Sequence, residues 1–232
     1  MPQVIRIQLM AHPWHHSISS SRKFQGQPED YLDIHSWFDQ TKSCFADFRH
    51  RALRHHTEGI ELCVQLFGHS LTNSSLLQVN VGDVGRQHVQ EDCGKIVTCQ
   101  DWFSNMAEPS WFNPTQISQD EVISRLEKHY RIPIEVSTPL VGWFYSPEQF
   151  IEGNLWYALR SHAEGIFLAE SVFGKVLYPS NQISNSVQPT RFIAEQIVKL
   201  QLGRIPSAQD WLKHIKPAAW MVTTAKIEKT LH

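Results

Sequence analysis

Two stretches of the chain are nearly the same, and they decide the fold: Ala52-Leu-Arg-His-His-Thr-Glu-Gly-Ile-Glu-Leu-Cys-Val-Gln-Leu-Phe-Gly68 and Ala158-Leu-Arg-Ser-His-Ala-Glu-Gly-Ile-Phe-Leu-Ala-Glu-Ser-Val-Phe-Gly174. Ten of the 17 aligned positions are identical, at an offset of 106 residues. A second pair of stretches, 94–103 and 203–212, matches at an offset of 109. Identity this dense at a nearly constant spacing predicts a tandem duplication, in which each copy forms one structural unit.

The duplication sets the predicted domain boundaries. We expect a first, histidine-rich repeat unit at residues 10–112, a linker at 113–118 and a second, degenerate unit at 119–221. Residues 1–9 are then an N-terminal extension and residues 222–232 a C-terminal tail. We expect the two repeats to pack with approximate two-fold symmetry.

Local patterns indicate a mainly α fold with a small β-hairpin in each unit. Apolar residues spaced by three and four positions predict long amphipathic helices at Phe45–Phe67 and 146–173, each followed by a glycine that ends it. Short runs on either side of an Asn/Ser turn, Ser70–Thr72 and Leu77–Val81, predict the hairpin of the first unit. The equivalent hairpin of the second unit is expected near Val176–Tyr178.

Composition excludes several classes of protein. Hydrophobic residues make up 41% of the chain, which excludes a disordered polypeptide, and the net charge of −2 makes nucleic-acid binding by bulk charge unlikely. The sequence has no apolar run of the roughly 18–20 residues that a membrane span needs, and no signal peptide. Four cysteines without a C-x-x-C pair favour a reducing, cytoplasmic compartment.

The two copies serve as controls for each other, because residues kept in both are expected to build the unit. His56 and His162 are kept and are expected to be buried, hydrogen-bonded structural residues. The pairs Arg54–Glu58 and Arg160–Glu164 are spaced i,i+4, which predicts ion pairs on a helix. Three pairs of tryptophans are expected to anchor the core: Trp37 with Trp143, Trp102 with Trp211, and Trp111 with Trp220.

Residues present in only the first copy are the candidates for chemistry. The chain has 13 histidines, and the second copy replaces His35 by Val141, Asp39 by Tyr145, His55 by Ser161 and His88 by Ile197. His88, Glu91 and Asp92 share one helix face, a spacing that suits a divalent metal such as Zn or Mn. The candidate ligands are His35, His50, His88, Glu91 and Asp92.

Other interpretations of these residues stay open. They could face solvent in the first unit while their apolar counterparts face the other repeat, or they could line an anion or nucleotide pocket. On one continuous helix, His55 and His56 would point in different directions and could not chelate as a pair. The cluster of His12, His15 and His16 alone does not define a site.

Several motifs in order resemble a family of short bacterial and phage proteins of unknown function that begin M-A-H-P-x-H-H. They are Met10-Ala-His-Pro-Trp-His-His16, His35-Ser-Trp-Phe-Asp39, Asp47-Phe-Arg-His-Arg-Ala-Leu-Arg-His-His56 and Gln87-His-Val-Gln-Glu-Asp92. The resemblance covers roughly residues 10–112 and implies a prokaryotic or phage origin, with Met10 as the usual start. It supplies no activity.

Two functions compete on this evidence. The first is a non-catalytic interaction or modulator protein that binds a host protein, because the divergence from polar to apolar residues in the second repeat creates an asymmetric docking face. The alternative is a metal-dependent hydrolase with a His/carboxylate site in the first repeat. The sequence carries no phosphate-binding loop, nucleophile elbow or zinc-protease motif.

Overall fold

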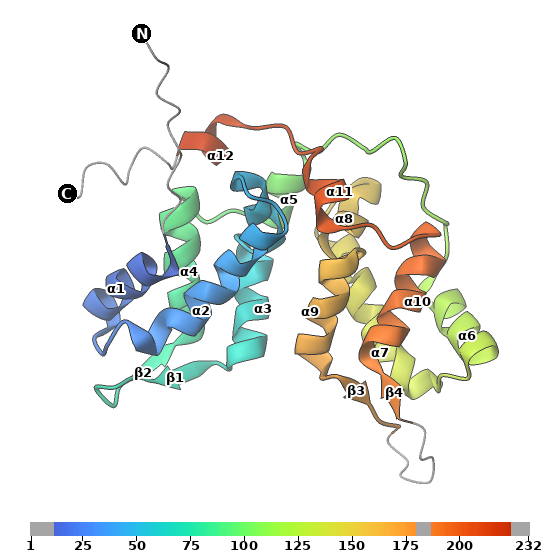
Figure 1. Ribbon diagram of the computed structural model, residues 1–232, viewed down its shortest axis with the longest axis horizontal. Coiled ribbons are helices and arrows are strands. Elements are labelled where there is room, and N and C mark those ends of the chain that lie inside the picture. The colour runs from blue at the N-terminus through green and yellow to red at the C-terminus, as the bar shows by residue number, and fades with distance from the viewer. Residues whose placement is uncertain (1–11, 180–186, 224–232) are drawn as a thin grey trace. The chain divides into compact units, whose positions relative to one another are not determined.

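A computed structural model describes residues 12–179 and 187–223 of the chain. Within these ranges the chain is mainly helical, as predicted, with two separate two-stranded antiparallel sheets (Figure 1). The predicted extension, residues 1–9, and most of the predicted tail, residues 222–232, lie outside the described residues. None of the described helices has both the length and the apolar character needed to cross a bilayer.

The chain divides into two compact units, and each contains more than one stretch of sequence. Of the described residues, the first unit holds 12–43, 53–98 and 217–223, and the second holds 44–52, 99–179 and 187–216. Residues 44–52 and 99–112 of the first repeat are therefore part of the second compact unit.

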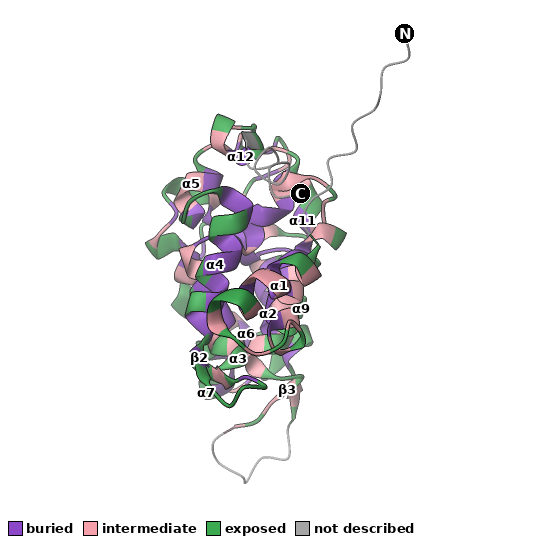
Figure 2. Cartoon of the chain, turned by 90° about the vertical axis from the view of Figure 1, so that its left-hand side faces the viewer, coloured by how far each residue is buried: buried purple, intermediate pink, exposed green. Residues whose placement is uncertain are grey.

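The first unit is a small helical bundle. Helices α1 (Pro13–Phe24) and α2 (Glu29–Asp39) pack against each other, and α4 (Val81–Cys93) packs against α2 and α3 (Thr57–Phe67). The hairpin of β1 (Ser70–Thr72) and β2 (Gln78–Asn80) joins α3 to α4, as predicted, with Leu71 paired to Val79. The 3-10 helix η1 (Gln40–Ser43) follows α2 directly, and α12 (Ala219–Thr223) completes the unit. Most residues of α4 are buried, and this helix is largely purple in Figure 2.

The second unit repeats this order of elements. Helices α6 (Gln119–Tyr130) and α7 (Ile134–Tyr145) pack together, and α10 (Thr190–Leu202) packs against α6, α7 and α9 (Ala163–Phe173). Strands β3 (Val176–Leu177) and β4 (Gln188–Pro189) form its hairpin. The remaining short helices of this unit are α5 (Cys99–Phe103), η3 (Ser146–Gln149), η4 (Gly153–Trp156), α8 (Tyr157–Arg160), α11 (Ala208–Leu212) and most of η2 (Phe48–Leu53).

Equivalent residues of the two repeats meet inside the second unit. Met106 and Ile215, which are 109 residues apart, form an antiparallel bridge. The backbone N–H of Ala107 donates to the carbonyl of His214, and that of Lys216 donates to the carbonyl of Asn105. An antiparallel bridge between equivalent positions is the local geometry that a two-fold axis relating these two segments would produce.

The two long helices predicted from apolar spacing are wrong, because each is broken at the same place. The 3-10 helix η2 ends at Leu53, and α3 starts only at Thr57. His56 between them is extended, with φ −161° and ψ 172°, and its Nδ1 accepts a hydrogen bond from the backbone N–H of Gly59 at 3.0 Å. His56 therefore caps the start of α3. The prediction was wrong because the i,i+3/i+4 spacing of apolar residues continues across the break and gives no sign of it.

His162 caps α9 in the same way. Its Nδ1 accepts from the N–H of Gly165 at 3.0 Å, while its Nε2 lies 3.1 Å from the carbonyl of Leu159. A carbonyl only accepts, so Nε2 carries the proton and Nδ1 keeps the lone pair that the cap needs. Both capping histidines are buried, which agrees with their expected structural role.

The arginines kept in both copies contact tryptophan, and among the described interactions Glu164 binds a backbone N–H and His162 rather than Arg160. The Arg160 guanidinium lies 4.2 Å from the Trp143 ring and donates to the Trp143 carbonyl, while Glu164 accepts from the backbone N–H of Ala208 at 2.6 Å. In the first unit Arg54 stacks 4.4 Å from the Trp37 ring and donates to the Trp37 carbonyl. Glu58 lies 3.2 Å from the cap residue His56. The break between Arg160 and the start of α9 removes the helical turn on which the Arg160–Glu164 prediction depended.

The six predicted tryptophan anchors differ in burial. Trp102, Trp143 and Trp211 are buried. Trp37, Trp111 and Trp220 are half-buried and stack with Arg54, Arg204 and Lys95, respectively, as the buried Trp143 does with Arg160. Half of these residues therefore build the core, and the other half form stacking surfaces at its edge.

The glycine after each capping histidine is required by a close backbone approach, not by packing of two helices. A Cβ built on Gly165 would lie 1.9 Å from the Arg160 carbonyl oxygen, and one on Gly59 would lie 1.9 Å from the Arg54 carbonyl oxygen. Real Cβ atoms never come so near to backbone oxygen, so only glycine fits this turn.

We expect Gly165→Ala to destabilise the protein by roughly 1–3 kcal/mol or more, because the backbone must move to admit the methyl group. Gly142→Ala is the matched control, since Gly142 lies inside α7 and its built Cβ meets nothing nearer than 4.0 Å. Alanine there should be neutral or stabilising by up to about 1 kcal/mol. Denaturant unfolding of both variants measures the difference, and equal stabilities would contradict the close-approach argument.

Candidate metal centre

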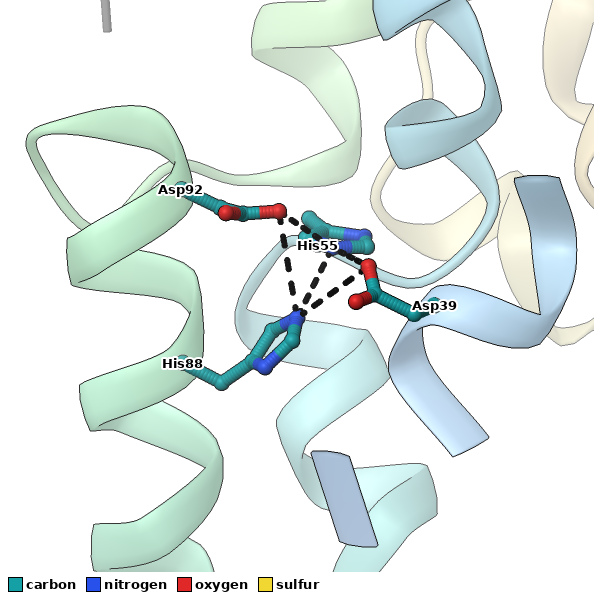
Figure 3. A group of neighbouring side chains, drawn as sticks. All are labelled: Asp39, His55, His88 and Asp92. Carbon is teal, nitrogen blue, oxygen red and sulfur yellow. Dashed lines mark hydrogen bonds and ion pairs between the residues drawn. The ribbon is translucent and has the colours of Figure 1, made fainter. Parts of the chain in front are cut away.

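Four ionisable side chains from three segments of the first unit converge on one point (Figure 3). Asp39 is the last residue of α2, and His55 lies in the turn that precedes α3. His88 and Asp92 are one turn apart on α4, so their side chains leave the same face of that helix. One ligand atom from each of the four lies within 4.8 Å of all the others. We call this group the His/Asp cluster.

The distances within the His/Asp cluster are within about 0.5 Å of those between ligands of one tetrahedral metal ion. His88 Nε2 lies 3.0 Å from His55 Nε2, which lies 3.1 Å from Asp92 Oδ2. Asp39 Oδ1 lies 3.8 Å from both imidazole Nε2 atoms, and His88 Nε2 lies 3.9 Å from Asp92 Oδ2. A tetrahedral site with bonds of roughly 2.0–2.2 Å places its ligand atoms about 3.3–3.6 Å apart. The observed separations lie on both sides of that range.

The cluster is buried, which makes its charges expensive unless they are balanced. His55 and His88 are fully buried, Asp92 is 2% exposed and Asp39 is 5% exposed. Burial raises the pKa of Asp39, but His55 and the Lys42 ammonium, 2.8 Å away, outweigh burial and hold that pKa below its usual range. The Asp39 carboxylate is therefore ionised and available as a ligand.

His16 of α1 supplies a second cation beside the cluster. Its Nδ1 lies 2.6 Å from Glu91 Oε2 and its Nε2 lies 3.2 Å from Asp92 Oδ1. Burial opposes protonation of His16, yet the hydrogen bonds to Asp92 and Glu91 raise its pKa to about 9. At neutral pH His16 is an imidazolium that balances the carboxylates of α4.

The neighbouring imidazoles stay neutral. Burial, and then the charge of His16, lowers the pKa of His35 to about 3 and that of His88 well below its usual value. His35 Nδ1 lies 3.0 Å from His88 Nδ1, so His35 contacts the nitrogen of His88 that does not face the other cluster residues. Neutral imidazole is the form that binds metals, and a metal-bound histidine usually hydrogen-bonds through its other nitrogen.

The structure brings together three of the five ligands proposed from the sequence and places the other two elsewhere. His88 and Asp92 belong to the cluster, and His35 contacts it. Glu91 lies at its edge, where it binds His16. His50 lies in η2, in the part that belongs to the second compact unit. The alternative that these residues face solvent does not hold for His35, His88 and Asp92, which are 0–2% exposed.

Sequence reasoning missed Asp39, His55 and His16. Asp39 and His55 did carry a signal, because each is replaced in the second copy together with the predicted ligands. His55 was set aside because a continuous helix would turn it away from its neighbour, and the break at residues 54–56 removes that objection. His16 lies at the buried side of α1, whereas the adjacent His15 is exposed.

The second unit has the same frame with an uncharged centre. The positions of Asp39, His55, His88 and Asp92 are taken by Tyr145, Ser161, Ile197 and Gln201. Ser161 Oγ lies 2.8 Å from Gln201 Oε1, and Tyr145 donates its hydroxyl to the Ile117 carbonyl at 2.8 Å. Neutral hydrogen bonds and an aliphatic side chain thus replace the charged group.

We expect His16→Ala to lower the stability of the metal-free protein by roughly 3–5 kcal/mol, because it leaves buried carboxylates without their cation. The pKa of His16 in the folded state, about 9, exceeds its ordinary value of 6.5. The stabilisation should therefore be complete below about pH 6.5 and lost as the pH rises through about 9. Unfolding of chelator-treated protein across this pH range measures it.

His15→Ala is the control for that experiment, since it removes an exposed imidazole from the same helix. Its effect should stay within about 0.5 kcal/mol. A His16→Ala variant as stable as His15→Ala at pH 6 would show that His16 does not balance the cluster.

Comparison with known proteins assigns the chain to a family without assigning a function. A family model described as a domain of unknown function, DUF6915, matches residues 11–112 and again residues 134–221. No curated protein and no solved structure matches the chain. The two matched segments fit a duplicated unit, and the chain therefore belongs to the DUF6915 family.

Proposed function

We propose that the first unit binds one divalent transition-metal ion through Asp39, His55, His88 and Asp92. The observation that carries this proposal is the convergence of two imidazole nitrogens and two carboxylate oxygens within 4.8 Å in a fully buried setting. Solvent does not reach these groups, so their mutual approach is not the loose clustering of acidic residues that is common on surfaces. A cation at the centre would offset the repulsion between the two carboxylates.

The ligand set favours zinc among the common divalent ions. Magnesium and calcium prefer oxygen ligands alone, whereas a pair of imidazoles suits zinc and its neighbours in the first transition series. The near-tetrahedral spacing suits zinc as well, while manganese prefers six ligands rich in oxygen. Zinc is therefore the ion we propose, and manganese is the alternative that metal analysis would distinguish.

Burial of all four ligands supports a structural role rather than a hydrolytic one. Structural zinc sites use four protein ligands, whereas catalytic sites keep one position open for water. The ligands here are at most 5% exposed and come from α2, α4 and the turn before α3. A bound ion would tie these three segments together and stabilise the first unit. The hydrolase predicted as an alternative would also need a route for substrate to a fifth position.

The test is the metal content of the protein purified without a histidine tag. Mass spectrometry should find about one zinc ion per chain, because the second unit lacks the ligands. Free zinc at 100 times its dissociation constant should raise the free energy of unfolding by about 2.7 kcal/mol. His88→Ile, which installs the residue found at position 197 of the second unit, should abolish both effects.

His15→Ala is the control, because it removes a histidine of the first unit that lies outside the cluster and is exposed. It should keep the full metal content and the full stabilisation by zinc. A wild-type protein without metal that zinc fails to stabilise would contradict the proposal, and so would a His88→Ile variant that binds zinc as tightly as the wild type.

We propose binding of a protein partner as a second function, and one position of the second unit supports it. Phe167 of α9 stands where the first unit has Glu61, and it is 54% exposed, with the Arg191 guanidinium 4.4 Å from its ring. An exposed aromatic ring beside an arginine is typical of the residues that dominate protein interfaces.

We also propose a reducing, cytoplasmic compartment. The free cysteines support it, and burial raises the pKa of the Cys63 thiol to about 12.

Phe167→Glu tests the interaction proposal, because it restores the acidic residue of the first unit at an exposed site. Affinity purification from bacterial lysate should recover a partner with the wild-type chain and lose it with the variant. Ser171→Ala, a change at an exposed position one turn along α9, is the control and should keep the partner. Recovery of the same proteins by wild type and Phe167→Glu would contradict a docking role for this residue.

A further inference from the structure

We infer that His35 is a positioning residue for the metal centre: with Ser20 and Gln87 it forms a relay that directs the lone pair of His88 Nε2 toward the metal. The inference rests on the proposed function for the role of that lone pair. The relay itself consists of hydrogen bonds that are present in the metal-free protein, so it can be tested without metal.

The direction of the relay is set at Gln87. Its Nε2 lies 2.8 Å from Glu91 Oε1 and 2.8 Å from Ser19 Oγ. Ser19 Oγ also donates to Glu91 Oε1 at 2.6 Å, and His16 Nδ1 lies 2.6 Å from Glu91 Oε2, so Glu91 accepts at both carboxylate oxygens. The amide N–H₂ of Gln87 must therefore face Glu91, which turns the amide oxygen toward Ser20, 3.4 Å away.

The remaining protons follow from that orientation. Because the amide oxygen of Gln87 accepts, the Ser20 hydroxyl donates its only proton to it. Ser20 Oγ must then accept at its other contact, 2.9 Å from His35 Nε2, so His35 carries its proton on Nε2. A neutral imidazole has one N–H, and His35 Nδ1 is therefore an acceptor.

The last link places the proton of His88. His35 Nδ1 and His88 Nδ1 are 3.0 Å apart, and a hydrogen bond between them needs one proton. His35 accepts at that nitrogen, so His88 donates from Nδ1 and keeps the lone pair on Nε2. His88 Nε2 is the nitrogen that faces His55 and the two carboxylates of the cluster (Figure 3).

Packing holds the relay in this arrangement. Ser20, His35 and His88 are fully buried and Gln87 is 7% exposed, so water cannot compete for their protons. The Phe38 ring stacks on the His88 imidazole, with centroids 4.7 Å apart and planes inclined by 19°. The second unit keeps a glutamine, Gln196, but has Val141 and Ile197 in place of His35 and His88. The relay is thus absent where the metal ligands are absent.

The direct test uses nitrogen-15 NMR of the metal-free, full-length protein with labelled histidine. The His88 ring should show a protonated Nδ1 and an unprotonated Nε2, assigned by comparison with His88→Ile. Most histidines in water prefer a proton on Nε2, so the expected tautomer would not arise by default. A proton on Nε2 of His88 would overturn the inference, whether or not the protein binds zinc.

Variants test the link to metal binding, with affinity measured by competition with a chelating dye. His35→Leu, which cannot accept a proton, should weaken zinc binding by roughly 10–100-fold, whereas His35→Asn, whose amide oxygen can take the place of Nδ1, should stay within about threefold of the wild type. Ser20→Ala should weaken binding, and Ser17→Ala is its control. Ser17 is equally buried on α1 but donates to the Pro13 carbonyl, outside the relay.

The two proposals fail in different ways. A wild-type chain that binds no metal would contradict the proposed function, and the NMR experiment alone would then decide the relay. A wild-type chain that binds zinc with the same affinity as His35→Leu and Ser20→Ala would overturn the relay and leave the metal site in place. Equal weakening by His35→Leu and His35→Asn would also count against it, because size and not proton acceptance would then matter.

Discussion

The burial of two carboxylates beside two imidazoles is the constraint on which the first unit depends. Asp39 and Asp92 repel each other in a medium that screens charge poorly, and a buried charge that loses its partner is strongly destabilising. Lys42 and His16 supply positive charge from opposite sides, and His16 does so from α1. The position of α1, the end of α2 and the inner face of α4 are thus linked by electrostatics as well as by apolar packing.

The two repeats show that this electrostatic linkage can be separated from the frame that carries it. Both copies keep the arginine stacked on tryptophan, the histidine cap and the glycine under a carbonyl, at Arg54, His56 and Gly59 and their counterparts. These features fix the backbone turn before α3 and α9, and none of them involves a side chain of the His/Asp cluster. In the second copy the four cluster positions hold only neutral side chains. Losing the cation that pairs with one of the carboxylates would leave a buried charge unpaired, so we expect the charged residues to change together.

The sequence predicted the repeated unit, its helical class and the hairpin of the first unit, because these features depend on local patterns. It also identified His88 and Asp92, since their spacing along one helix does not depend on the rest of the chain. It failed at Asp39 and His55, because their meeting depends on the direction of the chain after Leu53, which apolar spacing does not encode. A histidine that caps a helix at His56 marks the break. Histidine is not among the preferred N-cap residues, which are Ser, Thr, Asp and Asn, so the sequence gives no clear cap signal there. His50 lies in the part of η2 that belongs to the second compact unit, and its spacing in the sequence carries no signal of that boundary.

The contrast between the repeats bears on why the first unit keeps its charges. The second unit shows that tyrosine, serine, isoleucine and glutamine fill the same positions with neutral hydrogen bonds and apolar contacts. A buried ionic cluster is often no more stable than an apolar replacement of similar size, so stability of the frame does not require it. The hydrogen bonds that surround the cluster, from Gln87 through Ser20 and His35, add further polar groups that a purely structural core would leave out. The same chain thus contains a frame that folds without these groups, so ligand binding is the more economical explanation for their presence. The donor set of two imidazoles and two carboxylates could hold a metal cation.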